Sequence, residues 1–154
     1  MIRRITTNLV KIRRNSTGFN TLGDFLCNSC GRRNICFLPP TKACNNYIPT
    51  MKFRDLSGTE GRFATFRSRT WADVLRLGME VGICDAETVS LHRIAIVQEI
   101  HCGDRGEMEE IYGPLSHISI GKPFDLEEYR RARVKQIGPM IYNFQKQVAV
   151  IILE

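Results

Sequence analysis

Residues 61–84 read GRFATFRSRTWADVLRLGMEVGIC, and three structural elements can be predicted from them. Apolar and polar side chains alternate over 62–67, which is the period-two pattern of a β-strand. Thr70 precedes Asp73 by three positions, the spacing of a capping box that starts a helix. Residues 80–84 are mostly apolar and end before a polar turn, which predicts a second strand. A strand, a helix and a strand in this order indicate a mixed α+β domain.

Further elements follow along the chain. They are a strand over 91–100, a helix over 108–112, a helix over 125–137 and a strand over 147–153. Gly113-Pro114 and Gly138-Pro139 are expected to stop the two helices, because proline cannot continue a helix. The last strand is β-branched and nearly continuously apolar, so we expect it to be central in the sheet. The alternation predicts a small curved sheet or β-barrel with short helices at its ends.

The order of these elements resembles a known family. Thr65-x-Arg67 on a strand, a short helix with Trp71, and Leu-x-x-Gly-x-x-Val leading into a strand resemble the ASCH domain. The resemblance covers roughly residues 53–154. It implies a small PUA-like β-barrel flanked by short helices, with a cleft beside the barrel that faces RNA or a nucleotide.

The resemblance also implies candidate site residues. Some ASCH-like proteins are small amidohydrolases that act on acetylated cytidine with a Lys, a Thr and a Glu. Thr65 matches the Thr, and the Lys falls at Arg62, which stays protonated and cannot serve as a base. The Glu falls at Glu109 or Glu110, and the spacing does not decide between them. The catalytic residues therefore stay unassigned.

The residues themselves point to ligand binding on the first strand. Thr65 and Arg67 lie two positions apart on a strand, so their side chains share a face. A hydroxyl and a guanidinium together can hold a phosphate or a base edge. The alternative is that Arg67 pairs with an acid such as Glu99 and has a structural role only. The predicted ligand-binding residues are Arg62, Thr65, Arg67 and Arg69.

Four cysteines crowd into residues 23–52 and indicate a metal site. Cys27, Cys30, Cys36 and Cys44 have the pattern C-x2-C-x5-C-x7-C. Two thiolates on a tight turn and two more that close a tetrahedron are typical of structural zinc. An iron–sulfur cluster also takes four cysteines, and four unrelated thiols are the remaining alternative.

The first third of the chain is strongly basic. Residues 1–52 hold nine Lys or Arg against one acid, a net charge of +8, whereas residues 53–154 have a net charge of −2. Such asymmetry favours an acidic partner, nucleic acid first. The predicted nucleic-acid contacts are Arg32, Arg33, Lys42 and Lys52, with Phe37 and Tyr47 available for stacking. The alternative is a solvated basic face around a metal core.

Three segments are predicted: a basic arm over 1–22, a four-cysteine metal module over 23–52 and an ASCH-like domain over 53–154. No apolar run is long enough to span a bilayer. Cysteines gathered for a metal favour a reducing compartment, so we expect a cytoplasmic protein without a membrane partner. The arm also has the composition of a mitochondrial presequence, which is the less favoured alternative.

The sequence as a whole predicts a protein that binds nucleic acid, RNA rather than DNA, through a PUA-like cleft and a basic zinc module. One alternative is a small hydrolase in the same cleft, acting on modified nucleosides or RNA as an amidohydrolase or nuclease. Another is a protein–protein adaptor. The sequence does not decide whether the protein is an enzyme, and it predicts no oligomeric state.

Overall fold

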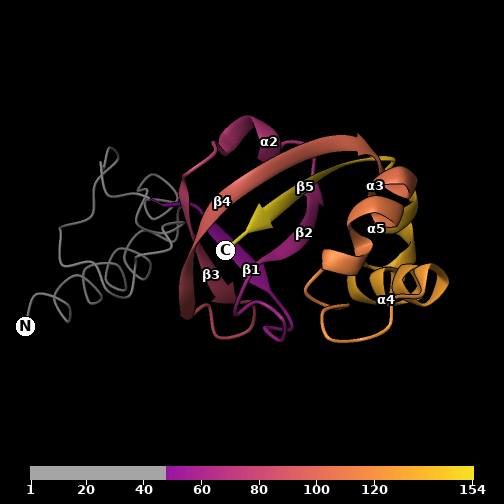
Figure 1. The fold of residues 1–154 in the computed structure, drawn as a ribbon, viewed down its shortest axis with the longest axis horizontal. Helices are drawn as coiled ribbons and strands as arrows, with labels where there is room; N and C mark the ends of the chain where they lie inside the picture. The colour runs from indigo at the N-terminus through magenta and orange to yellow at the C-terminus, as the bar shows by residue number, and fades with distance from the viewer. Residues whose placement is uncertain (1–47) are drawn as a thin grey trace, which may run out of the picture. The chain divides into compact units, whose positions relative to one another are not determined.

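The computed structural model of the chain describes residues 48–154 (Figure 1). The strands are β1 (Thr50–Phe53), β2 (Phe63–Ser68), β3 (Glu80–Asp85), β4 (Leu91–Asp104) and β5 (Gln147–Leu153). They form a sheet in the order β1-β3-β4-β5-β2. β1 runs parallel to β3, and β5 runs antiparallel to both β4 and β2. The fold is therefore mixed α+β with a five-stranded sheet.

Short helices accompany the strands. They are α2 (Trp71–Val74), α3 (Arg105–Tyr112), the 3-10 turn η2 (Gly113–Leu115), α4 (Leu126–Ile137) and α5 (Pro139–Phe144). Asp125 caps α4, because its carboxylate accepts a hydrogen bond of 2.7 Å from the backbone N–H of Glu128. Each helix described here, the longest having 12 residues, falls short of the length and apolar character that crossing a membrane requires.

The described residues fall into two compact units. One unit holds residues 48–54 and Glu80–Ala95, and the other holds Asp55–Met79 and Ile96–Glu154. The second unit contains β2, β5, the end of β4 and the helices of the described residues. In Figure 1, α3, α4 and α5 gather beside one another as orange to yellow ribbons.

The core of the second unit lies between the helices and the β2–β5 pair. Phe66 of β2 lies opposite Val150 of β5 in the antiparallel register. Burial of this apolar face is the main force that holds the helices on the sheet. The buried cluster consists of Ala64, Phe66, Tyr129, Val148, Val150 and Ile152.

The structure corrects the expectation of a closed β-barrel. β1 and β2 are the two ends of the strand order in the described part of the chain, so this sheet is open. The outer edge of β2 is instead met by a single parallel bridge between Ala64 and Ser116. The loop after η2 therefore takes the place that a neighbouring strand would occupy in a barrel.

Two local expectations also differ from the structure. Thr70 adopts helical backbone angles and makes no capping bond, and its hydroxyl instead lies 2.7 Å from that of Ser68, so the predicted capping box is absent. Gly138-Pro139 does not only end α4. Pro139 is also the first residue of α5, a position at which its missing N–H costs nothing.

Several predictions concern residues outside the described range. The basic arm and the four cysteines lie there, as do Arg32, Arg33 and Lys42. The predicted boundary between residues 52 and 53 falls inside β1, so the strand pairing of the sheet begins before it. Within residues 48–154, no three His, Cys, Asp or Glu side chains are grouped so that they could hold a metal ion.

Candidate functional site

β2 brings two of the predicted ligand-binding residues together. The Arg67 Nε–H donates a hydrogen bond of 3.1 Å to the Thr65 hydroxyl oxygen. Thr65 is buried, and Arg67 is partly buried at the end of the strand. The contact follows from the alternation of β2, which places both side chains on one face. The guanidinium is thereby held in a fixed direction.

His117 joins this pair from the loop that follows η2. Its backbone N–H donates a hydrogen bond of 3.4 Å to the carbonyl of Ala64, which fixes the loop against the edge of β2. The imidazole packs edge-to-face on Phe63 with 6.0 Å between ring centroids. Gly58 permits the approach, because a Cβ there would lie 2.2 Å from the His117 carbonyl oxygen.

The environment keeps His117 uncharged at neutral pH. Burial is the largest cause that lowers the pKa of its imidazole to about 4; the nearby positive charge of Arg67 also lowers it, and Asp55 opposes the change. A neutral imidazole can both donate and accept a hydrogen bond. His117 therefore adds a polar group to the site without adding a third positive charge.

Arg133 of α4 supplies the second cation. Only 6% of this residue is exposed, and its guanidinium carbon lies 5.2 Å from the centroid of the Phe66 ring. Among the described residues, the Arg133 Nε has no hydrogen-bond partner. Burial lowers the pKa of Arg67 to about 10, and repulsion from Arg133 contributes. Two guanidiniums near each other at low exposure favour an anion.

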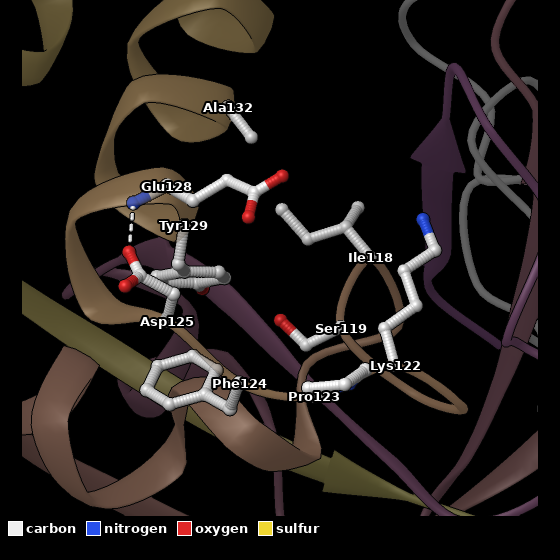
Figure 2. Close-up of a pocket in the computed structure, with 9 residues that line it drawn as sticks. All are labelled: Ile118, Ser119, Lys122, Pro123, Phe124, Asp125, Glu128, Tyr129 and Ala132. Atoms are coloured by element: carbon white, nitrogen blue, oxygen red, sulfur yellow. Dashed lines mark hydrogen bonds between the residues drawn. The ribbon is translucent and has the colours of Figure 1, made fainter.

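We call Thr65, Arg67, His117 and Arg133 the cationic cluster. Two residues that line a pocket of about 420 Å³ are sequence neighbours of cluster residues: Ile118 follows His117, and Ala132 precedes Arg133. Figure 2 shows the pocket between α4 and the loop that leads to it. The lining residues are Ile118, Ser119, Lys122, Pro123, Phe124, Asp125, Glu128, Tyr129 and Ala132.

The alternative in which Arg67 pairs with Glu99 is not supported by the contacts that Glu99 makes. Its carboxylate pairs with the guanidinium of Arg62, and it accepts a hydrogen bond of 2.8 Å from Nε2 of His101. The hydrogen bond from His101 is the main reason that the pKa of Glu99 is lowered. The His101 ring stacks on Tyr112 at 4.6 Å. Arg62 therefore belongs to this second group and not to the cationic cluster.

The two candidate glutamates of α3 have different surroundings. Glu109 is fully buried and accepts hydrogen bonds of 3.0 and 2.9 Å from the Tyr142 hydroxyl and one of 3.2 Å from Arg130. Its carboxylate thus ties α3 to α4 and α5. Glu110 is exposed, with a carboxylate oxygen 3.7 Å from Arg130. These hydrogen bonds satisfy the buried carboxylate of Glu109, so a structural role is enough to explain its burial.

The remaining predicted contacts are exposed. Arg69 lies in the turn after β2, and Lys52 lies on β1 of the first unit. Sequence reasoning missed His117 and Arg133. No spacing signals a lone histidine in a loop, and Arg133 differs from its neighbours only by lying one helical turn after the apolar Tyr129.

Comparison with known proteins gives little further information. No family model and no curated protein matches the chain. Protein EF3133 from Enterococcus faecalis, described by family model DUF984, is similar with a TM-score of 0.47 and 10% identity, over 64% of this chain and 63% of that one. A ZmASCH serine-to-alanine mutant from Zymomonas mobilis is similar with a TM-score of 0.44 and 14% identity, over 68% and 66%. The chain thus spans less than two thirds of either protein, and at these scores the similarity assigns neither fold nor function.

Proposed function

We propose that this protein binds RNA and that the cationic cluster holds one of its phosphates. The observation that carries the proposal is the buried guanidinium of Arg133 near the partly buried guanidinium of Arg67, which bonds to the Thr65 hydroxyl. Burying a charge is costly unless an opposite charge compensates it. A phosphate bound beside both planar guanidiniums compensates the buried charge of Arg133, whose Nε has no partner among the described residues, and accepts several charge-assisted hydrogen bonds.

The preference for RNA over DNA rests on the resemblance to ASCH domains. The strand with Thr65-x-Arg67, the helix with Trp71 and the final apolar strand occur in the order that this resemblance implies. The resemblance to ASCH domains suggests that the function is RNA binding in a PUA-like cleft. In this proposal the basic residues before β1 contact further phosphates, and a zinc ion on the four cysteines holds their segment together.

The test compares two arginine substitutions that remove the same charge. Affinity for a fluorescein-labelled single-stranded RNA is measured by anisotropy at several salt concentrations. Arg67→Ala should weaken binding about tenfold and lower the salt slope by about one, as expected for one lost phosphate contact. Arg131→Ala removes an exposed arginine of α4 and should have a much smaller effect.

Two further measurements complete the test. Arg67→Lys should not restore full affinity, because lysine lacks the planar fork. A DNA strand of the same sequence should bind more weakly than the RNA. Equal losses for Arg67→Ala and Arg131→Ala, with identical salt slopes, would contradict a phosphate site at the cluster.

A further inference from the structure

We propose that the pocket between α4 and the loop before it receives a guanine base of the bound RNA. The inference rests on the proposed function and adds base selectivity to it. A volume of about 420 Å³ is in the range of small-ligand sites. Figure 2 shows the rings of Phe124 and Tyr129 on one side of the pocket; Tyr129 is buried, and the partly exposed ring of Phe124 offers a surface on which a flat base can stack.

One carboxylate in the pocket is available to a ligand. Figure 2 shows the Glu128 side chain extending from α4 across the pocket toward Ile118. Its carboxylate makes no hydrogen bond or ion pair with any described residue, and its backbone N–H donates to the Asp125 carboxylate. The Asp125 carboxylate, by contrast, accepts that N–H at 2.7 Å and is committed to capping α4.

A hydroxyl complements this acceptor. The Ser119 hydroxyl points into the pocket in Figure 2, whereas the Lys122 side chain runs past Ile118 with its ammonium directed away from the pocket centre. The pocket thus presents a pair of acceptor oxygens from one wall and a hydroxyl from the other. A ligand that fits has two adjacent N–H donors on one edge and acceptors on the next.

Guanine is the common base with this pattern. Its N1–H and N2 amino group form an adjacent donor pair that a carboxylate can accept bidentately, and its O6 and N7 are acceptors for a hydroxyl. Adenine, cytosine and uracil each lack two adjacent donors. A carboxylate also repels phosphate, so the charges direct the base toward Glu128 and the phosphate toward Arg67 and Arg133.

The experiment uses the full-length protein and short single-stranded RNAs that differ at one position. Anisotropy is measured for oligonucleotides with guanosine, inosine, adenosine or cytidine at the central position of a uridine tract. The guanosine strand should bind about tenfold more tightly than the adenosine strand, the discrimination typical of a bidentate contact. Inosine lacks the N2 amino group and should lose most of this advantage.

Variants assign the preference to the pocket. Glu128→Gln should abolish the guanosine preference while leaving the affinity for the other strands unchanged or higher. Glu127→Gln is the matched control, because the Glu127 carboxylate pairs with Arg130 at 3.1 Å, and it should keep the preference. Ser119→Ala should reduce the preference in part.

The outcomes separate this inference from the proposed function. RNA binding that depends on Arg67 but shows equal affinity for the guanosine and adenosine strands would overturn the guanine pocket alone. A guanosine preference that survives Glu128→Gln would overturn it as well. Absence of measurable binding to every RNA would overturn the proposed function and the pocket together.

Discussion

Replacing His117 with asparagine should make the stability of the protein less sensitive to acid. In the folded protein, burial and the charge of Arg67 lower the imidazole pKa from 6.5 to about 4. The unfolded chain therefore takes up a proton near pH 6.5, whereas the folded protein resists it until about pH 4. Stability is fully present above pH 6.5 and is lost as the pH falls through this window.

The magnitude follows from the two pKa values. A fall from 6.5 to about 4 corresponds to about 3 kcal/mol of folding free energy, most of which is lost between pH 7.5 and pH 4.5. His117 is only 7% exposed, so solvent screening reduces this figure little. Asparagine has no proton to gain in this range and keeps a polar amide in place of the ring.

The assay is urea unfolding of the wild-type protein and His117→Asn at four pH values from 7.5 to 4.5. Carboxyl groups titrate in both proteins, so the difference between them isolates the histidine. The wild-type protein should lose about 2 to 3 kcal/mol more than the variant over this range. A difference that stays constant from pH 7.5 to pH 4.5 would refute a buried neutral histidine beside Arg67.

Three other predictions test the packing and the metal module. Gly58→Ala should lower the free energy of unfolding in urea by more than 2 kcal/mol, because a positive φ and a carbonyl oxygen 2.2 Å away both oppose a Cβ. The control Gly121→Ala meets only a positive φ and should lower it by about 1 kcal/mol. Equal losses of stability in the two variants would count against the contact of Gly58 with His117. Tyr142→Phe should cost about 2 kcal/mol, since buried Glu109 loses its hydroxyl donor, and an unchanged unfolding midpoint would show that the bond adds nothing. The full-length protein should carry one zinc ion by elemental analysis, and undiminished zinc in Cys30→Ser would contradict the four-cysteine site.

Local patterns predicted most of the regular elements. The apolar run Gln147–Leu153 is a strand with the bounds expected, and Asp125 caps α4 as its position before a helical pattern indicates. Both signals lie within a few residues of the element that they define. The contact between Thr65 and Arg67 could be predicted for the same reason, since strand alternation alone places both side chains on one face.

Contacts between segments far apart in the sequence could not be predicted from local patterns. The open edge of β2 is met by Ser116 of a loop, and no periodicity encodes that bridge, so a barrel was expected and His117 was overlooked. Arg133 reaches the cluster only because α4 packs on Phe66. The helix that Pro139 begins was missed because a Gly-Pro pair ends one helix and starts another with the same residues.

A double-mutant cycle on Arg67 and Arg133 tests the central claim most directly. Affinity for a single-stranded RNA is measured for wild type, Arg67→Ala, Arg133→Ala and the double variant, each checked for a cooperative thermal transition. If both guanidiniums hold one phosphate, each single change should weaken binding about tenfold and the double change far less than a hundredfold. Losses that multiply fully, or RNA affinity that neither change reduces, would contradict a shared phosphate site.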